Sequence, residues 1–374
     1  MKILVPVGTR PEIVKLAPVV AALRTSGIET VVVATGQHHD PALSGDVFRD
    51  LGLAPDIVWA LSGGESDRIG QLLRSAFNVV VRERPDVVLL LGDTNTVPLF
   101  CLAARRACTP IVHLEAGLRS RNPTSMEEVN RQVAGALASL HLAPTELSAK
   151  FLREEGVVEE RIRVVGNPII DVLRTSRRTP VALEARRGVV VTAHRATNVD
   201  DQDRLHTLVR LLHRLTDEIG EVTFPIHPRT RQRLEAADLV DELNCPGIRA
   251  TGPVPWERMV DLVAASQVVV TDSGGLQEEA SFFGVPVVVL RRSTPRWESV
   301  QCGISTLTGL EVDRAVTAAT HFCLPEVQAR VAATPCPYGD GRTAERVVSL
   351  LHDRDALDLL TLCEPDFIDQ SPQW

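Results

Sequence analysis

Short apolar runs alternate along this chain with longer amphipathic stretches, and this alternation constrains the fold more than any other feature. In the first half, the apolar runs predict strands at residues 3–7, 30–35, 86–91, 110–114 and 162–165. The stretches between them have helical spacing and predict helices at 11–24, 67–83, 96–107, 127–137 and 146–155. Strands that alternate with crossover helices form a parallel, doubly wound α/β sheet.

The same alternation starts again after a polar stretch without periodicity, residues 174–187, which we interpret as a linker. Strands are predicted at 188–192, 222–226, 248–251, 268–271 and 285–290, and helices at 201–218, 228–237, 256–265 and 276–283. The predicted architecture is α/β, with two Rossmann-like doubly wound domains that face a central cleft. The predicted domains are residues 1–175 and 180–355, followed by a tail at 356–374. Ligands bind such sheets at the carboxyl ends of their strands.

Charge and composition exclude several classes of partner. The 374 residues include 40 Lys and Arg against 48 Asp and Glu, a net charge of −8 that argues against nucleic acid or an anionic membrane surface. No apolar run approaches the roughly 20 residues of a membrane span. The seven cysteines have no metal-ligand spacing, and the apolar stretch at the N-terminus is too short for a signal peptide. These features predict a cytoplasmic protein with reduced thiols.

The first predicted strand ends in Gly-Thr-Arg-Pro-Glu, which places Arg10 and Lys15 near a strand end and a helix start. Two cations at that place suit a diphosphate, although a simple turn with a solvated arginine explains the motif equally well. The dinucleotide fingerprint G-x-G-x-x-G and the P-loop sequence are both absent. Nicotinamide and P-loop nucleotide binding therefore have no support.

Three carboxylates are predicted at one edge of the first sheet. Asp93 follows the most apolar strand, Glu115 follows the next strand, and Glu127 opens a helix after a polar loop. Taken alone, Asp93 could cap a helix. Glu127 could lie in the first turn of a helix because the helix dipole stabilises a negative charge there. Three acids at one edge repel one another, and this repulsion costs stability. Such clusters occur at catalytic sites, where they supply pairs of general acids and bases.

The second half carries a predicted anion site. His194 and His227 each follow a strand and precede an arginine, although a lone histidine is more often structural. The segment 271–279 reads T-D-S-G-G-L-Q-E-E, a strand, a turn of small residues and a helix start. Glycines allow the backbone to approach a phosphate, and the amides of a helix N-terminus favour its charge. Glu279, on the same helix, is placed to accept hydrogen bonds from ribose hydroxyls.

These motifs, in this order, resemble the non-hydrolysing UDP-N-acetylglucosamine 2-epimerases, whose two-domain fold is similar to that of the GT-B glycosyltransferases. The resemblance extends from about residue 2 to about residue 308 and includes G-T-R-P-E, G-Q-H, G-D-T, E-A-G-L-R, E-E-x-N-R and T-D-S-G-G-x-Q-E-E. It implies catalytic roles for Asp93, Glu115, Glu127 and His194. The residues expected to bind substrate are Arg10, Lys15, Arg131, His227, Ser273, Gly274, Gly275, Glu279 and Arg296.

The resemblance also implies a reaction, inversion at C2 of a UDP-sugar without a metal or redox cofactor. UDP leaves as the C1–O bond breaks, a carboxylate removes the C2 proton to give a 2-acetamidoglycal, and UDP adds back after protonation from the opposite face. Members of the family are expected to be homodimers.

The sequence departs from the family pattern at three positions, and these departures leave open which sugar, or which N-acyl group, the protein accepts. Thr197 stands where the family usually has Glu, Met126 where Pro commonly precedes the E-E pair, and Trp297 where the T-E-R-P-E segment has Pro. Three other functions remain open: a hydrolysing epimerase that releases UDP and ManNAc, a GT-B glycosyltransferase that uses a UDP-sugar, and an inert UDP-sugar sensor.

Overall fold

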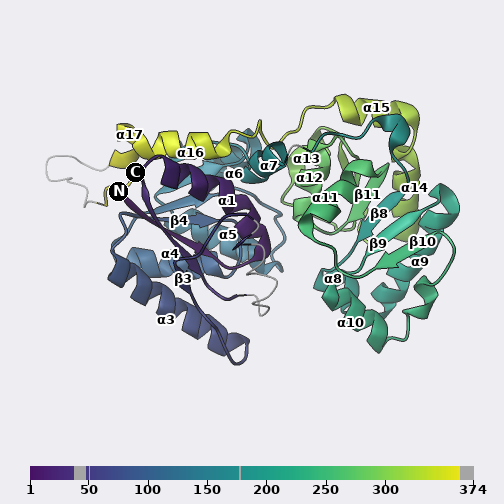
Figure 1. The fold of residues 1–374 in the computed structure, drawn as a ribbon, viewed down its shortest axis with the longest axis horizontal. Helices are drawn as coiled ribbons and strands as arrows, with labels where there is room; N and C mark the ends of the chain where they lie inside the picture. The colour runs from purple at the N-terminus through teal and green to yellow at the C-terminus, as the bar shows by residue number, and fades with distance from the viewer. Residues whose placement is uncertain (38–47, 50, 177, 363–374) are drawn as a thin grey trace. The chain divides into compact units, whose positions relative to one another are not determined.

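The computed structural model describes residues 1–37, 48–49, 51–176 and 178–362 (Figure 1). Their contacts divide the chain into two compact units. The first unit contains Met1–Leu118, Pro123–Pro168 and the described residues from Arg342 onward, and the second contains Arg119–Asn122 and Ile169–Gly341. The chain therefore crosses between the units several times.

The first unit is built on a parallel sheet of seven strands in the order β3-β2-β1-β4-β5-β6-β7. Every residue of the central strand β4 is buried, as expected for a strand that is covered on both faces. The strands are β1 (Lys2–Val7), β2 (Glu29–Ala34), β3 (Ile57–Val58), β4 (Val87–Leu91), β5 (Ile111–Leu114), β6 (Leu140–Ala143) and β7 (Ile162–Val164).

Two apolar clusters cover the two faces of this sheet. One joins the sheet to α1, α16 and α17, and the other joins it to α3, α4 and α5. In Figure 1, α16 lies alongside α1, although more than 300 residues separate them in the sequence. The helices are α1 (Arg10–Thr25), α3 (Glu65–Glu83), α4 (Thr96–Arg106), α5 (Met126–Leu137), α6 (Glu146–Glu154), α16 (Thr343–His352) and α17 (Arg354–Asp358).

The second unit repeats the plan with a parallel sheet of six strands in the order β10-β9-β8-β11-β12-β13. Its largest apolar cluster joins the sheet to α9, α14 and α15. The strands are β8 (Val189–Thr192), β9 (Val222–Pro225), β10 (Ile248–Thr251), β11 (Val268–Thr271), β12 (Val287–Val289) and β13 (Ser305–Leu307). The helices are α7 (Pro168–Thr175), α8 (Ala196–Val199), α9 (Gln202–Ile219), α10 (Pro228–Ala236), α11 (Trp256–Ala265), α12 (Gly274–Phe282), α13 (Trp297–Gln301), α14 (Val312–Phe322) and α15 (Pro325–Ala333).

The predicted fold class, two doubly wound α/β sheets, is confirmed, and the cleft between the halves stays a prediction. The predicted domain boundaries differ from the boundaries of the two compact units. Residues 342–355 were assigned to the second domain, but the apolar face of α16, with Val347 and Leu351, lies in the core of the first unit. Residues 356–358 of the predicted tail end α17, and residues 363–374 lie outside the described part of the chain.

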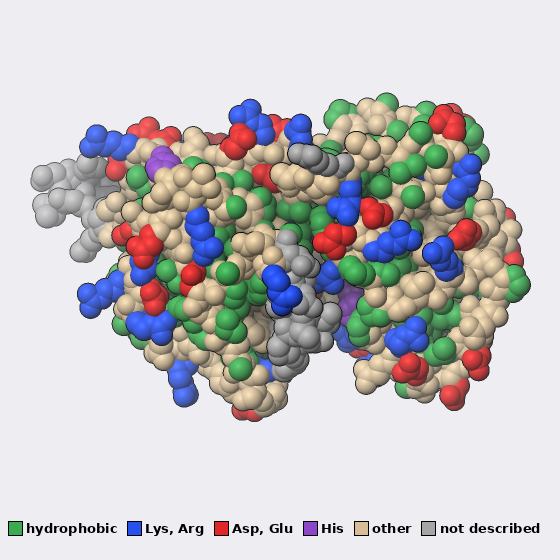
Figure 2. Space-filling model, in the orientation of Figure 1, with side chains coloured by type: hydrophobic (Ala, Val, Ile, Leu, Met, Phe, Trp, Pro, Cys, Tyr) green, Lys and Arg blue, Asp and Glu red, His purple; other side chains and the backbone are tan. Residues whose placement is uncertain are grey.

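Three short strands were not predicted, β3, β6 and β13, because each has only two to four residues and no clear alternation. The predicted linker also begins inside α7 and contains a 3-10 turn at Leu183–Ala185. No helix in the described residues is long and apolar enough to cross a membrane. Figure 2 shows acidic and basic side chains mixed over the visible face of the protein, without a broad region of one sign.

Candidate active site

Charged residues follow three neighbouring strands of the first unit, β1, β4 and β5. In the order β2-β1-β4-β5, the connections leave β1 and β4 in opposite directions, so the topological switch point of the sheet lies between these two strands. Arg10 opens α1 directly after β1, and Asp93 and Glu115 follow β4 and β5. This edge is where ligands bind in sheets of this kind.

Glu115 is a buried carboxylate in a left-handed backbone conformation. Its φ is 63°, which is uncommon for a residue other than glycine and marks strain of the kind that clusters at functional sites. Its Oε1 forms an ion pair with Nζ of Lys15, which is also buried and comes from α1. Removing either partner would leave a charge uncompensated in the interior.

Asp93 is held by two residues of α5. Its carboxylate pairs with Nη1 of Arg131, and its backbone carbonyl accepts a hydrogen bond from Nδ2 of Asn130 at 2.9 Å. Arg131 also pairs with Glu128 at 2.5 Å, so one buried guanidinium joins two carboxylates. Asn95, not Asp93, occupies the N-cap position of α4. The capping interpretation of Asp93 is therefore wrong.

Glu127 and Arg10 are more accessible than the buried Glu115 and Lys15. Glu127 lies in the first turn of α5, is half-buried, and accepts a hydrogen bond from Oγ of Ser125 at 2.6 Å. Arg10 is half-buried, and its guanidinium has no hydrogen bond or ion pair with another described residue. Arg10 is therefore available to an incoming anion.

The structure brings Asp93 and Glu115 to the predicted edge of the sheet, but in a different electrostatic state from the one expected. We expected a cluster of mutually repelling acids, whereas each of these two carboxylates has a cationic partner. Lys15 and Arg131, which we expected to bind substrate, are those partners. The sequence does not reveal these pairs because 100 residues separate Lys15 from Glu115 and 38 separate Arg131 from Asp93.

Glu12 belongs to the same edge and was not among the predicted site residues. It is buried and accepts hydrogen bonds from the amides of Gly8 and Thr9, at 2.7 and 2.8 Å, and from Oγ1 of Thr94 at 2.7 Å. Burial raises the pKa of Glu12 to about 7, against the opposing effect of these hydrogen bonds. Glu12 thereby connects the turn after β1 to the loop that carries Asp93.

This raised pKa predicts a pH-dependent stability of the first unit. Between the ordinary pKa of 4.5 and about 7, the folded state binds more protons than the unfolded state, so stability falls as pH rises through this window. We expect the loss to be about 3 kcal/mol and to be absent in Glu12→Gln. Hydrogen exchange of the β1 and β4 amides measures it. Equal pH slopes in the two proteins would contradict the assignment.

In the second unit, a fully buried carboxylate organises the end of β8. Asp272 accepts hydrogen bonds from the amides of His194 and Arg195, at 3.1 and 3.0 Å, and from Nδ2 of Asn198 at 3.0 Å. Nδ1 of His194 lies 3.1 Å from the same carboxylate. Burial alone would raise the pKa of Asp272, but His194 and the other donors outweigh burial and lower it to about 2. Asp272 thus fixes His194 with Nε2 available to a ligand.

The turn after β11 has the features of an anion site. Ser273 is the N-cap of α12, where its hydroxyl accepts a hydrogen bond from the amide of Leu276. The guanidinium of Arg296 lies over Gly274, so that a Cβ added there would come within 3.1 Å of it, and a Cβ added at Gly275 would lie 3.9 Å from Oγ of Ser273. Nε of Arg296 donates to Glu278 at 2.8 Å, which holds the guanidinium in place. A helix N-terminus beside a fixed guanidinium favours a phosphate.

Glu279 and His227 have local partners in the same unit. Oε1 of Glu279 accepts a hydrogen bond from Nε1 of Trp256 at 2.8 Å, which orients the carboxylate. His227 is the N-cap of α10, where its Nδ1 accepts from the amide of Arg229 at 3.2 Å, and its ring lies 5.2 Å from that of His194. Trp256 and Asp272 were not predicted as site residues, although Asp272 stands inside the T-D-S-G-G motif.

Two doubly wound units, one with the features of an anion site and the other with fixed carboxylates at its strand ends, are typical of an α/β enzyme of the nucleotide-binding class. Residues 21–352 match the family model described as UDP-N-acetylglucosamine 2-epimerase. This chain belongs to the UDP-N-acetylglucosamine 2-epimerase family, and it is therefore an enzyme of the isomerase class.

Two relatives that act on UDP-sugars match nearly the whole chain. The UDP-N-acetylglucosamine 2-epimerase of Methanocaldococcus jannaschii is 34% identical over 94% of this chain and 99% of its own length. Its crystal structure in complex with UDP-GlcNAc and UDP superposes with a TM-score of 0.86, covering 94% of this chain and 99% of that one. The UDP-2,3-diacetamido-2,3-dideoxy-D-glucuronate 2-epimerase of Pseudomonas aeruginosa is 33% identical over 94% of this chain and 99% of its own length.

A glycosyltransferase shares the fold more distantly. The structure of VinC in complex with dTDP superposes with a TM-score of 0.52 at 17% identity, covering 95% of this chain and 99% of that one. This likeness concerns the fold alone and is consistent with a GT-B-like architecture.

Proposed function

We propose that this protein interconverts UDP-GlcNAc and UDP-ManNAc by eliminating UDP to a 2-acetamidoglycal and adding it back. The observation that carries the proposal is the placement of Asp93 and Glu115 at adjacent strand ends, each held by a buried cation. Each ion pair fixes the position of a carboxylate at its strand end, and a positioned carboxylate can accept a proton from a substrate. The family of the chain and the 34% identical epimerase agree with this chemistry.

The first step requires stabilisation of a departing diphosphate. In the second unit, the α12 N-terminus with Ser273, Gly274 and Gly275 supplies amides, and Arg296 supplies a fixed positive charge. We assign the diphosphate to this turn, with His194 as a further contact and His227 beside it. Preorganised donors of this kind act on charge as it develops in the transition state. Glu279, oriented by Trp256, is assigned to the ribose hydroxyls.

The second step moves a proton at C2. Inversion needs one proton-transfer group on each face of the sugar ring, and we assign these roles to two of Asp93, Glu115 and Glu127. In this proposal, Lys15 and Arg131 act mainly by holding Glu115 and Asp93 in position. The step needs neither a metal ion nor a redox cofactor, because the proton becomes acidic once the C1–O bond breaks.

The sugar itself is the open part of the proposal. The Pseudomonas aeruginosa relative is named for a diacetamido uronate, and its identity to this chain is nearly that of the UDP-GlcNAc epimerase. Thr197 and Trp297 depart from the family motifs close to His194 and Arg296 in the sequence. A second candidate activity is therefore epimerisation of a modified UDP-N-acetylhexosamine.

An NMR time course with UDP-GlcNAc in D₂O tests the proposed reaction. We expect UDP-ManNAc with deuterium at C2. Release of UDP and free ManNAc would instead indicate the hydrolysing reaction, and transfer of the sugar to an added acceptor would indicate a glycosyltransferase. If UDP binds but UDP-GlcNAc is not converted, UDP-2,3-diacetamido sugars are the next substrates, and a failure of all of them would leave a UDP-sugar sensor.

We further propose that the protein is a homodimer that acts in the cytoplasm. Four apolar side chains at four-residue intervals on α3 are exposed by 37 to 49%: Ile69, Leu73, Phe77 and Val81. We call them the α3 stripe. The helix carries Glu65 and Asp67 near its start and Arg82 near its end. Two copies of α3 packed antiparallel would bury both stripes against each other, as a two-fold interface requires. The six described cysteines are free thiols, which fits a reducing compartment.

Substitution within the α3 stripe is expected to give monomers. Phe77→Glu would place two charges in the centre of the interface, where they are desolvated without partners. Sedimentation velocity measures the change. Val158→Glu, at an exposed apolar residue of the same unit outside α3, is the control and should stay dimeric. A monomeric wild-type protein, or a Phe77→Glu dimer of unchanged stability, would contradict the proposed interface.

A further inference from the structure

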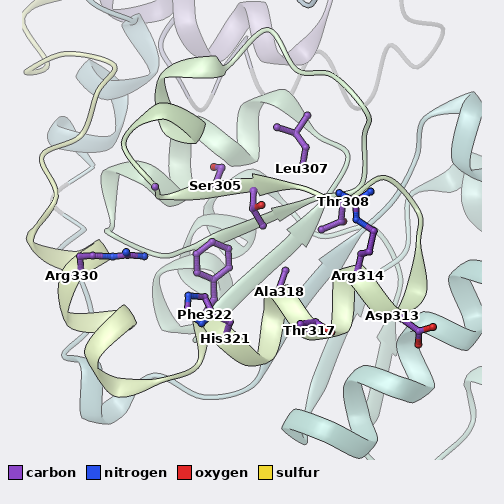
Figure 3. A pocket seen from close by; sticks show the side chains of 12 residues that line it. Ser305, Leu307, Thr308, Asp313, Arg314, Thr317, Ala318, His321, Phe322 and Arg330 are labelled. Atoms are coloured by element: carbon purple, nitrogen blue, oxygen red, sulfur yellow. The ribbon is translucent and has the colours of Figure 1, made fainter.

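The second unit contains a cavity at the outer edge of its sheet. Its volume is about 680 Å³, and it is lined by β13 and the residues after it and by one face of α14, with Arg330 of α15 at its side (Figure 3). β13 is the last strand of the sheet, and β12 separates it from β11, after which Asp272 and Ser273 lie. The cavity is therefore distinct from the anion site at the start of α12.

Unused hydrogen-bonding groups face this edge. The amide of Val287 donates to Ile304 and that of Thr308 donates to Val289, at 2.9 and 3.0 Å. Because hydrogen bonds alternate along a parallel strand, the backbone groups of Ser305 and Leu307 point away from β12. Oγ of Ser305, in the wall of the cavity, is buried and has no hydrogen-bond partner in the described part of the chain. Such a group favours a polar ligand.

The rim of the cavity is cationic. Arg314 and His321 on α14 and Arg330 on α15 are exposed, and their side chains form no hydrogen bond or ion pair with other described residues. Figure 3 shows Arg314 and Arg330 toward opposite ends of the cavity. Asp313 is the acid among the lining residues, and it pairs with Arg214 at 3.2 Å. The charges at this place are complementary to an anion.

Apolar side chains form the floor between these cations. Phe322 is buried at the end of α14, and Ala318 and Leu307 are half-buried beside it. A cavity of several hundred Å³ with an apolar floor and a few polar groups is typical of small-molecule sites. The occupant that fits therefore combines an anionic group with an apolar body.

We propose that this cavity binds a small organic anion, a phosphate or carboxylate carried on an apolar group. The anionic group contacts Arg314 or Arg330, and the apolar body lies against Phe322 and Leu307. An acidic peptide paired with β13 is the competing occupant. The strand has only three residues, so it offers a peptide the backbone groups of Ser305 and Leu307 alone, which favours the small molecule. The proposal does not depend on the epimerase reaction.

Phenyl phosphate is the probe for this site. Its binding to the full chain is measured by NMR titration at physiological ionic strength, with and without UDP. We expect saturable binding that UDP does not displace, and about tenfold weaker binding for Arg314→Gln with Arg330→Gln, because charge-assisted hydrogen bonds are lost. Thr317→Trp, an exposed α14 residue at the cavity, should block binding while leaving the charges intact. Benzoate replaces the phosphate of the probe by a carboxylate, so it compares the two anionic groups. Inorganic phosphate lacks the ring, so it measures the contribution of the apolar body.

Arg210→Gln is the matched control, because Arg210 is an exposed arginine of α9 in the same unit. Equal weakening by Arg210→Gln would show binding to surface charge in general and would overturn the site. Displacement by UDP would assign the probe to the nucleotide site and would also overturn it. Absence of binding at millimolar phenyl phosphate, or binding of an acidic peptide in its place, would exclude a small-anion site at β13.

Discussion

Glu115→Gln is expected to lower kcat by roughly 10²- to 10⁴-fold, the usual effect of removing a general acid or base, and to leave the affinity for UDP within a few-fold. The amide keeps the size of the side chain but cannot accept a proton, and it leaves Lys15 as a buried cation without its carboxylate. Asp93→Asn and Glu127→Gln are expected to act in the same direction. UDP affinity is retained because its proposed contacts lie mainly in the second unit.

The measurement combines steady-state rates with UDP titration by calorimetry, and the exchange of the C2 proton in D₂O separates proton transfer from C1–O cleavage. Glu160→Gln, at an exposed glutamate of the first unit, controls for the change in charge. A variant that releases UDP but does not exchange deuterium identifies the group that acts at C2. Wild-type turnover in all three carboxylate variants would overturn the assignment of the catalytic residues.

Arg186→Met is expected to destabilise the second unit by about 3 kcal/mol or more, since each buried carbonyl that loses its donor costs about 1–3 kcal/mol. The buried guanidinium donates to the carbonyls of Val181, Phe283 and Gly284 at 3.2, 2.8 and 2.7 Å. Phe283 and Gly284 follow the last residue of α12, and a positive charge at the C-terminus of a helix interacts favourably with the helix dipole. Methionine fills much of the same volume but supplies none of these hydrogen bonds.

Thermal unfolding is expected to report this loss as a decrease in Tm of about 6–12 °C for a unit of this size. Arg187→Met provides the control, because the neighbouring arginine is exposed and donates only to local carbonyls. Equal Tm values for the two variants would show that the buried guanidinium does not stabilise the second unit.

The sequence was sufficient to predict the two sheets and the strand ends that carry Asp93, Glu115 and Ser273. These features are local, because a strand end is marked by an apolar run that stops at Gly, Asp or Glu. The partners of the carboxylates were not predictable in the same way. Lys15 lies on α1 and Glu115 follows β5, 100 residues later, and no local pattern records which helix side chain meets which strand end.

The assignment of α16 failed for a related reason. An amphipathic helix at the end of a chain looks the same whether it covers the preceding sheet or an earlier one, and α16, which follows α14 and α15, covers the earlier one. Trp297 gives a second example. It departs from the family motif, and its Nε1 donates to the carbonyl of Arg119 at 3.0 Å, a residue four positions after Glu115 that belongs to the second unit. The sequence showed the substitution but not this contact.

The return of α16 to the first sheet determines the order in which the protein can fold during its synthesis. The second unit ends at Gly341, so it can fold as soon as this residue has left the ribosome. The first unit, although translated earlier, keeps one side of α1 uncovered until Ala344, Val347 and Leu351 emerge. A nascent chain arrested between the two would hold a finished second unit beside an apolar surface that chaperones recognise.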